Sequence, residues 1–482
     1  MVVIKKKERL KINIEDIVYG GNGISRQHKR DDKKFIIFIK NGIQGQTVLA
    51  EITKLKPNYA EAKIIDVIKK SVLQKKRIYQ KISGAPYYDL DINYQRKKKK
   101  DLVIEVFQKI GDVNDIEKYY DNFIKSPKTW HYRNKMEYAF SSIIYDNKKK
   151  CDVDEFGLGF KKSNIWWMVE NLNKDSGLFD KKWEDNIHHI RNYCQETKLP
   201  PWNIPQKKGF FRNLNVRKSY KDDKLLIELV TSSQGIEKFS SNCFINKIIE
   251  LHGKRIEGII HTVNDNVSDR INYEIAESKT IFGTSKITEN INGLDFEIYM
   301  SSFFQTNPLC AEKLYKKVVE YCNKVNNNSG IILDLFCGTG TISQMVAINK
   351  KNTRVIGVDI AESAIKNAIE SAKKNKIKNV EFHNIKTGEF LIENPHLKNK
   401  IDTIIIDPPR PGIAKKNLKK IIKLNSKKII YVSCNPSTQA RDIKILIKNG
   451  YKIEKFSIAD QFPHTHHIET IFMLIKSTDN VS

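Results

Sequence analysis

A strand, a glycine turn and a helical run follow one another from residue 331, and this unit limits the possible folds most. Ile331-Ile-Leu-Asp-Leu-Phe336 is apolar enough for a buried parallel strand, and Cys337-Gly-Thr-Gly340 leads into a helical run from Thr341. Glycines in such a turn let backbone amides approach a ligand at the helix N-terminus. The next apolar strand, Val355-Ile-Gly-Val-Asp359, ends in an acid 21 residues after Gly338. An open α/β sheet that binds a nucleotide-like molecule is therefore expected.

The ligand that suits this turn is S-adenosylmethionine rather than a dinucleotide. A dinucleotide site prefers a third glycine at position 343, where this chain has Ser343. S-adenosylmethionine has no pyrophosphate, so a shorter glycine turn with a strand-end acid is enough. Asp359 would meet the ribose hydroxyls, and Asn384, at the end of a third strand, would lie beside the adenine. A lone glycine turn is usually only a tight turn, so this interpretation depends on the motifs that follow.

The fourth strand ends in a carboxylate and a rigid loop, Ile404-Ile-Ile-Asp407-Pro-Pro-Arg-Pro-Gly412. The two prolines would aim this loop at a substrate, although an ordinary strand stopped by proline has the same pattern. Methyltransferases of exocyclic amines carry an aromatic residue after Pro-Pro, where this chain has Arg410. Enzymes that methylate cytosine C5 in RNA carry a cysteine in this loop, and this loop has none.

The fifth strand is followed by a thiol. Ile429-Ile-Tyr-Val432 leads into Ser433-Cys434-Asn435-Pro436, where the proline ends the strand. Catalytic groups collect at the carboxyl ends of parallel strands, so Cys434 is a candidate nucleophile. As a lone cysteine it could also be a small buried apolar residue. Its use as a nucleophile needs a lowered pKa, available from nearby positive charge or a helix end.

A histidine-rich segment, His464-Thr-His-His-Ile-Glu469, precedes the last strand. No cluster of Cys or Asp offers ligand spacing beside it, so we expect no metal site. The histidines would rather orient the carboxylate or touch phosphate. Glu469 could be an ordinary salt-bridge residue, but beside a thiol nucleophile it is a candidate general base.

The charge of the chain favours a nucleic-acid partner. Lys and Arg number 84 and Asp and Glu 56, which gives the 482 residues a formal net charge of +28. Lys, Ile and Asn are frequent throughout, as in products of AT-rich genomes, so part of this surplus has a simpler origin. No run of about 18 apolar residues predicts a membrane helix or a membrane partner. Seven cysteines without a CxxC pair argue against a disulfide framework, and we expect a cytoplasmic location.

The N-terminal region, residues 9–68, has the pattern of a small all-β module. Gly20-Gly-Asn-Gly23 is a turn signal, Phe35-Ile-Ile-Phe-Ile39 a strand, Asn41-Gly42 a hairpin cue and Pro57-Asn58 a turn. Five or so short strands in this length fit an OB-like barrel, a shape that often holds RNA.

Strand-like pieces alternate with turns in the region that follows, which indicates an α+β middle domain. Tyr132-Arg-Asn-Lys135 and Gly209-Phe-Phe-Arg212 place Arg beside aromatic residues, as stacking on unpaired bases requires. Core aromatic residues with a surface Arg nearby are an equal alternative.

Five motifs resemble those of the RNA uracil-5 methyltransferase family, in the family's order. They are Phe303-Phe-Gln-Thr-Asn-Pro308, Asp334-Leu-Phe-Cys-Gly-Thr-Gly340, Asp407-Pro-Pro-Arg410, Ser433-Cys-Asn-Pro436 and His464-Thr-His-His-Ile-Glu469. The N-terminal module resembles the TRAM domain. The resemblance implies a multi-domain chain with a TRAM RNA-binding β-barrel (1–68), a middle RNA-binding domain (69–290) and an α/β Rossmann-like methyltransferase domain (291–482).

The resemblance also implies roles for individual residues. Cys434 would be the nucleophile and Glu469 the base in methylation of uridine C5. The candidate S-adenosylmethionine contacts, with Gly338 from the glycine turn, are Gln305, Phe336, Gly338, Thr341, Asp359, Asn384 and Asp407. Thr341 stands where several members of the family have Asn.

One departure from the family concerns iron. Many members bind an iron–sulfur cluster through cysteines just after the barrel, where this chain has Ile82-Ser-Gly-Ala-Pro-Tyr87. No cysteine precedes Cys151, so we expect no such cluster.

The resemblance leaves the RNA open. Because N-terminal barrels are commoner among the ribosomal RNA members of the family, we expect a uridine of 23S rRNA, with the T-loop of tRNA as the alternative. We expect a monomer. A non-catalytic RNA-binding protein, or a methyltransferase acting on adenine or cytosine, remains a further alternative.

Overall fold

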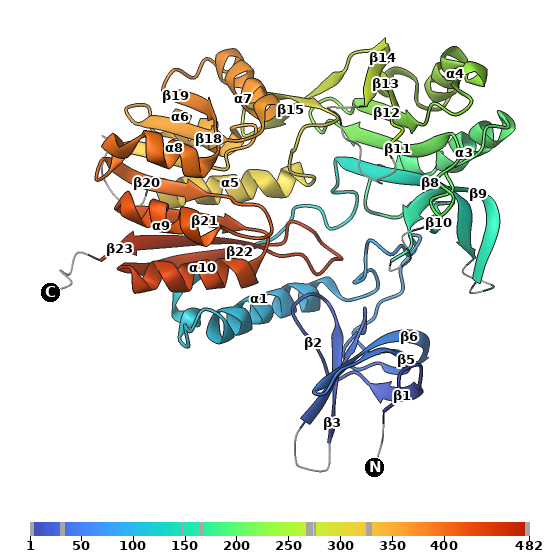
Figure 1. Cartoon of the computed structure of the whole chain (residues 1–482), viewed down its shortest axis with the longest axis horizontal. Helices are drawn as coiled ribbons and strands as arrows, with labels where there is room; N and C mark the ends of the chain where they lie inside the picture. The colour runs from blue at the N-terminus through green and yellow to red at the C-terminus, as the bar shows by residue number, and fades with distance from the viewer. Residues whose placement is uncertain are drawn as a thin grey trace.

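Three large β-sheets and one separate hairpin organise the computed structural model of the chain (Figure 1). The structure describes residues 4–28, 34–146, 149, 151–163, 165, 167–266, 273, 276–323 and 330–477. In Figure 1 the N-terminal sheet lies at the bottom, the C-terminal sheet at the left and the middle sheet at the right. No helix in these ranges is long and apolar enough to cross a membrane.

The N-terminal sheet has the strand order β1-β5-β6-β4-β3-β2. Its strands are β1 Arg9–Asn13, β2 Asp16–Ile17, β3 Gly23–His28, β4 Lys34–Ile39, β5 Thr47–Leu55 and β6 Tyr59–Lys69. Along β5, Val48, Ala50 and Ile52 are fully buried and alternate with more exposed residues, so one face of the strand covers a small apolar core. The prediction of an N-terminal all-β module is confirmed.

The hairpin predicted at Asn41-Gly42 is wrong, although the chain does turn there. Asn41 has a φ of 54°, but β4 and β5 on either side do not pair. The strand β6 lies between them, parallel to β4 and antiparallel to β5. The hairpin in this part of the domain is therefore β5–β6, which turns at Pro57-Asn58.

The middle sheet has the order β10-β9-β8-β11-β12-β13-β14 and is mixed, because β12 and β13 run parallel. Its strands are β8 Lys135–Asp146, β9 Cys151–Lys161, β10 Val169–Asn171, β11 Phe211–Lys218, β12 Leu225–Thr231, β13 Ile256–Val263 and β14 Glu277–Gly283. The helices of this region are α2 Lys181–Glu184, α3 Ile187–Glu196 and α4 Ser241–His252, with short 3-10 turns η2 Ile236–Lys238 and η3 Gly253–Arg255. Strands and helices share one core, which includes Trp183, Ile190 and Phe244.

The C-terminal sheet has the order β19-β18-β17-β20-β21-β23-β22-β7. Its strands are β7 Tyr120–Ile124, β17 Ile331–Leu335, β18 Arg354–Asp359, β19 Val380–Asn384, β20 Ile401–Ile406, β21 Lys428–Ser433, β22 Tyr451–Ala459 and β23 Glu469–Lys476. The helices that follow its strands or precede β17 are α5 Pro308–Asn323, α6 Thr341–Asn349, α7 Glu362–Lys374, α8 Thr387–Glu393, α9 Lys415–Lys423 and α10 Pro436–Lys448, and η4 covers Pro395–Leu397.

This sheet is covered on both faces. Leu333 and Leu335 belong to one apolar cluster and Ile332 to another, so successive residues of β17 enter different cores. The strand order reverses beside β17, because β18 and β19 lie on one side of it and β20 and β21 on the other. In an open parallel sheet, ligands bind outside the carboxyl ends of the strands at this position.

Part of the predicted middle domain packs with the C-terminal sheet instead. β7 pairs with β22 and so covers an edge that would otherwise have unpaired backbone groups. The helix α1 (Ile92–Lys109), which precedes η1 (Ile116–Tyr119), buries Leu102, Val103 and Phe107 in the C-terminal core, and the Phe107 and Phe472 rings stack 4.3 Å apart. Residues 92–124, inside the expected middle domain 69–290, thus pack with the C-terminal sheet.

The second predicted boundary, between residues 290 and 291, falls inside a hairpin. β15 (Lys286–Ile291) pairs with β16 (Leu294–Tyr299) in antiparallel register. The apolar face of this hairpin packs against α5 in the C-terminal core.

Candidate active site

The glycine turn between β17 and α6 is pinned to the acid that ends the neighbouring strand. The backbone N–H of Gly338 donates to Oδ2 of Asp359 at 2.9 Å. Phe336, Gly338 and Gly340 have φ values of 66°, 53° and 70°, so the chain follows a left-handed path that glycine tolerates best. A Cβ added at Gly338 would meet nothing within 4 Å, which leaves the space in front of the turn open.

Ser343, at the position where a dinucleotide fold prefers glycine, has a structural partner. Its hydroxyl donates to Oδ2 of Asp334 at 2.5 Å, and both side chains are fully buried. Burial raises the pKa of Asp334 to about 7. The Ser343 hydrogen bond therefore partly offsets the cost of burying the Asp334 carboxyl group near the turn.

Asp359 and Asn384 lie at adjacent strand ends, as β18 and β19 are paired in parallel register. The second carboxylate oxygen of Asp359 accepts the N–H of Ala361 at 2.9 Å, and the Asn384 amide donates to the carbonyl of Ile360 at 2.8 Å. Between them the Ile360 side chain is 63% exposed. An exposed apolar side chain flanked by a carboxylate and an amide offers an aromatic ring a face and polar edges.

A second group of side chains gathers at the carboxyl ends of β20, β21 and the start of β23. Ser433 pairs with Thr470, which brings Cys434 and Glu469 next to each other across the antiparallel pair β21–β23. The Cys434 thiol is half-buried and Glu469 is only 4% exposed. Both interact electrostatically with Asp407 and with the Arg410 guanidinium of the same loop.

The Cys434 thiol does not have the lowered pKa that its use as a nucleophile needs. Burial, followed by the charges of Glu469 and Asp407, raises the pKa of the Cys434 thiol to about 11. Arg410 acts in the opposite direction but is outweighed. A nearby cation does not lower the pKa of a thiol below its ordinary value when the same cleft buries the thiol beside two carboxyl groups.

The two carboxyl groups of this cleft also have raised pKa values. Burial raises the pKa of Asp407 to about 6 and raises that of Glu469 well above its ordinary value, with Asp407 as the next cause. Burial beside Asp407 therefore makes Glu469 a weaker acid than a carboxyl group in water. Once ionised, a carboxylate in such a position is a stronger proton acceptor than one in water.

Asn435, directly after the thiol, joins three segments and was missed as a functional residue. Its side-chain oxygen accepts the N–H of Ser437 at 3.1 Å and so caps α10, and its amide donates to the Arg410 carbonyl at 3.0 Å. The Asn-Pro pair at a helix start was a sequence signal for the cap, but the contact to Arg410 had none.

Gln305 lies close to a second residue that sequence reasoning missed, Gln461. The Gln461 amide donates to Oε1 of Gln305 at 3.2 Å and to the Asn307 carbonyl at 3.1 Å. Gln461 is fully buried. The Oε1 atom of Gln305 is thus held by a buried partner, which fixes the orientation of the Gln305 amide group.

Comparisons with known proteins identify the family. Residues 273–477 match the family described as tRNA (Uracil-5-)-methyltransferase, and residues 5–65 match the TRAM domain. An RNA methyltransferase of Clostridium tetani is 35% identical over 98% of this chain and 98% of its own length, and one of Clostridium acetobutylicum is 35% identical over 98% and 99%. The chain belongs to the RNA uracil-5 methyltransferase family.

A solved structure supports the same assignment. The tRNA (uracil-54, C5)-methyltransferase of Pyrococcus abyssi, in complex with S-adenosyl-L-homocysteine, is 25% identical, with a TM-score of 0.70 over 94% of this chain and 99% of that one. The protein is thus an S-adenosylmethionine-dependent RNA uracil-5 methyltransferase with an N-terminal TRAM domain. The open glycine turn, the Asp359 carboxylate and the exposed Ile360 fit the ribose and adenine of this cofactor.

Two of the histidines before Glu469, His464 and His467, are uncharged. The His464 ring stacks on Trp130 at 3.6 Å, and its Nδ1 lies 3.1 Å from the Gln95 amide. Burial lowers the pKa of His464 and of His467 to about 3, so neither carries the charge that a phosphate contact would use. Within the described ranges, no group of three or more His, Cys, Asp or Glu could hold a metal.

Hydrogen bonds hold residues 82–87, the segment where the family resemblance places the iron–sulfur motif. The N–H of Tyr87 donates to the His464 carbonyl at 3.0 Å, and the Ser83 hydroxyl donates to Glu170 at 2.7 Å. One hydrogen bond therefore connects this segment to the loop before Glu469, and the other connects it to β10 of the middle sheet.

The proposed base-stacking residues of the middle domain are core residues. Phe210 and Phe211 are fully buried, and Arg212 is 4% exposed, 4.3 Å from the Trp202 ring. Tyr132 is also fully buried, with its hydroxyl donating to the Pro463 carbonyl at 2.9 Å. Of the two interpretations of these motifs, the one that places the aromatic residues in the core is correct.

Proposed function

We propose that the protein methylates C5 of a uridine in RNA with Cys434 as nucleophile and Glu469 as general base. The observation that supports this proposal is the β21–β23 register: Cys434 and Glu469 adjoin the paired residues Ser433 and Thr470, and both interact electrostatically with Asp407 and Arg410. A nucleophile and a base from different strands in one buried cleft are what covalent catalysis at a pyrimidine requires.

The roles of the two residues follow from the chemistry of uracil. The Cys434 thiol gives up its proton to solvent, and the thiolate adds to C6 of uracil. The C6–S bond leaves an enolate with electron density at C5, so C5 becomes nucleophilic. After C5 has gained its methyl group, ionised Glu469 removes the C5 proton. The electron pair of that C–H bond forms the C5–C6 double bond again and expels the Cys434 thiolate. The target uridine must be unpaired, since this cleft cannot reach C5 and C6 inside a stem.

The candidate cofactor contacts hold S-adenosylmethionine, which supplies the electrophilic methyl group when bound. Asp359 and Asn384 would hold the ribose and adenine, and the turn at Phe336, Gly338 and Thr341 would hold the adjoining part. Gln305 and Asp407 would contact the end that carries the methyl group. The open space at Gly338 and the occupied oxygen of Gln305 support these assignments.

The substrate we propose is a uridine of 23S rRNA, supported by the TRAM domain at residues 5–65. A specific observation favours a second candidate, the T-loop of tRNA. The Pyrococcus abyssi enzyme, a tRNA (uracil-54, C5)-methyltransferase, is similar over 94% of this chain. An alignment of this length includes part of the N-terminal domain, so the tRNA candidate is tested beside the rRNA one.

The test is methylation with labelled S-adenosylmethionine of rRNA and tRNA, each taken from cells that lack the gene. We expect label in 5-methyluridine in one of the two RNAs, and a Cys434→Ser variant to be at least about 10³-fold slower. Label in adenine or cytosine, or full activity of the variant, would overturn the proposed roles. RNA binding without any label would favour a protein that only binds.

A further inference from the structure

A loop of the TRAM domain reaches the turn that carries the nucleophile. The Tyr19 hydroxyl donates to Oδ1 of Asn435 at 3.0 Å, a contact between residues 416 positions apart. The Tyr19 ring packs against the C-terminal apolar core, although the residue follows β2 of the N-terminal sheet. Burial and the nearby Cys434 raise the pKa of Tyr19 to about 12, so the hydroxyl is a donor at all working pH values.

The glycines after Tyr19 allow a second contact with the active-site segment. A Cβ added at Gly21 would lie 2.9 Å from Cβ of His466, in the segment that leads to Glu469. A Cβ added at Gly20 would meet nothing within 4 Å, although the two residues have similar φ values of 85° and 91°. Gly21 therefore touches the catalytic domain and Gly20 does not.

Other contacts fix the orientation of this domain on the helix α1. Nζ of Lys98 on α1 pairs with Asp16 of β2 at 2.5 Å, and the Tyr94 hydroxyl donates to Gln44 of the TRAM domain. An ion pair and a hydrogen bond from one helix hold the domain at the position where Tyr19 meets Asn435. The Tyr19 contact is therefore part of a docked interface.

We propose that the TRAM domain completes the active site, with Tyr19 as a positioning residue that acts on Cys434 through Asn435. The proposal rests on the proposed function of Cys434. Oδ1 of Asn435 has two lone pairs, one of which accepts the Ser437 N–H and the other the Tyr19 hydroxyl. With both satisfied, the amide of Asn435 stays directed at the Arg410 carbonyl, and the backbone next to the thiol keeps one conformation.

Two pairs of variants test this role. Tyr19→Phe removes only the hydroxyl, and Tyr59→Phe removes one from β6 of the same domain, where the ring packs against Phe38. Gly21→Ala intrudes on His466, and Gly20→Ala imposes the same backbone strain without that contact. The readouts are kcat, the KM for S-adenosylmethionine and the rate of Cys434 alkylation by iodoacetamide in the RNA-free protein, located by peptide mass spectrometry.

For Tyr19→Phe and Gly21→Ala we expect kcat to fall about tenfold with KM for S-adenosylmethionine unchanged, as one lost hydrogen bond predicts. We expect their alkylation rates to change at least about threefold, with both control variants like the wild type. Alkylation rates equal to the wild type in both variants would overturn the proposal, as would a Tyr19→Phe kcat within twofold of it. If the wild type methylated no RNA, the proposed function would fail, and the alkylation rates would still decide whether Tyr19 positions the thiol.

Discussion

At the scale of the residue, the reactive groups of the active site share one buried cleft. The Cys434 thiol, the Glu469 carboxyl and the Asp407 carboxyl all have raised pKa values, chiefly because they are buried together. Arg410 is the cation that lowers the pKa of both Cys434 and Glu469. A neutral thiol in the resting enzyme reacts slowly with oxidants and alkylating agents.

The pKa of about 11 predicts how Cys434 reactivity depends on pH. Below that value the thiolate fraction rises about tenfold per pH unit, so the alkylation rate of the RNA-free protein should keep rising to pH 9. Arg410→Gln should slow alkylation about threefold or more at fixed pH by raising the thiol pKa further, and Arg410→Lys should retain most of the rate. A plateau below pH 8 would contradict the raised pKa.

Asp334 predicts a pH dependence of stability. Its folded-state pKa of about 7 lies above the value of an unfolded aspartate, about 3.9, so folding binds a proton here. The stabilisation is fully present below pH 4 and is lost as the pH rises through 7. The Asp334→Asn variant can still accept the Ser343 hydrogen bond. Between pH 5 and 8, its Tm should decrease by at least about 2 °C less than the Tm of the wild type.

Thermal unfolding at the two pH values checks this expectation. Asp222→Asn, at an exposed position, is the matched control and should follow the wild type. An Asp334→Asn variant with the same decrease in Tm as the wild type would show that Asp334 is ionised in the folded protein.

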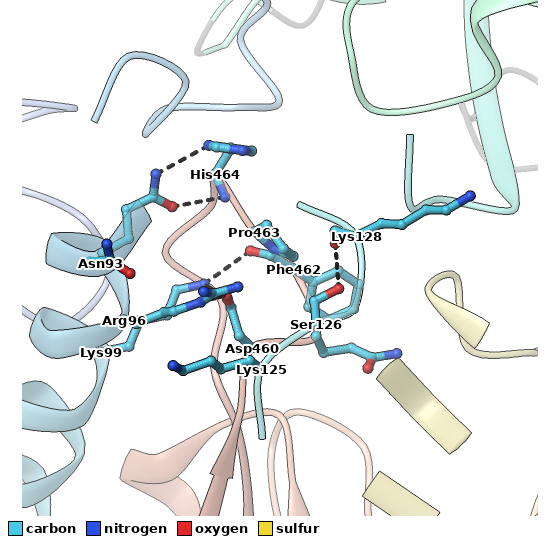
Figure 2. Close-up of polar contacts among 12 residues, drawn as sticks. Asn93, Arg96, Lys99, Lys125, Ser126, Lys128, Asp460, Phe462, Pro463 and His464 are labelled. Atoms are coloured by element: carbon cyan, nitrogen blue, oxygen red, sulfur yellow. Dashed lines mark hydrogen bonds and ion pairs between the residues drawn. The ribbon is translucent and has the colours of Figure 1, made fainter. Parts of the chain in front are cut away.

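At the scale of the element, the helix α1 holds the loop that ends in Glu469. Asp460, at the start of this loop, is buried with Lys99 at 2.8 Å and pairs with Arg96 at 3.1 Å (Figure 2). Nζ of Lys99 also donates to the Phe462 carbonyl at 3.0 Å. The same helix contributes Gln95, which binds His464. An element from the first quarter of the chain thus positions a residue near its end.

The buried ion pair predicts a large loss of stability for one lysine of α1. Lys99→Met leaves Asp460 buried with Arg96 as its main partner and should lower the free energy of unfolding by about 3 kcal/mol. Lys97→Met, at an exposed position of the same helix, should change it by less than about 0.5 kcal/mol. Urea unfolding measures both values, and equal stabilities of the two variants would refute a structural role for the Lys99–Asp460 pair.

At the scale of the whole molecule, the net charge of +28 favours a polyanionic partner such as RNA. The TRAM domain lies against α1 and the catalytic turn through the Lys98–Asp16 pair and the Tyr19–Asn435 hydrogen bond. RNA that touches the TRAM domain would therefore also lie close to the cleft at Cys434.

This charge predicts that RNA binding depends strongly on salt. Each neutralised phosphate releases a counterion, so the affinity for a short fluorescent RNA hairpin should fall by about 10²-fold or more between about 50 and 200 mM salt. Fluorescence anisotropy measures this loss. Binding of S-adenosyl-L-homocysteine involves no phosphate and should change less than about threefold over the same range. An RNA affinity that is equally insensitive to salt would mean that the lysines do not contact the RNA phosphates.

The sequence by itself determined the features that depend on neighbouring residues. Apolar runs ended by glycine, proline or a polar residue predicted β17, β18, β20 and β21, and the side chains Asp359, Asp407 and Cys434 lie at or just after their carboxyl ends as expected. Chain reversal and side-chain periodicity are decided within about ten residues, so a local pattern is sufficient. The all-β N-terminal module followed from the same rules.

Only the tertiary structure decided the features that depend on packing between distant segments. It joined α1 and β7 to the C-terminal sheet, inserted β6 between β4 and β5, and buried the aromatic residues at 210 and 211. It also raised the pKa of Cys434 and brought Tyr19 to Asn435 across 416 positions. Burial and long-range contacts arise when sheets and helices cover one another's apolar faces, and no single stretch of sequence contains that information.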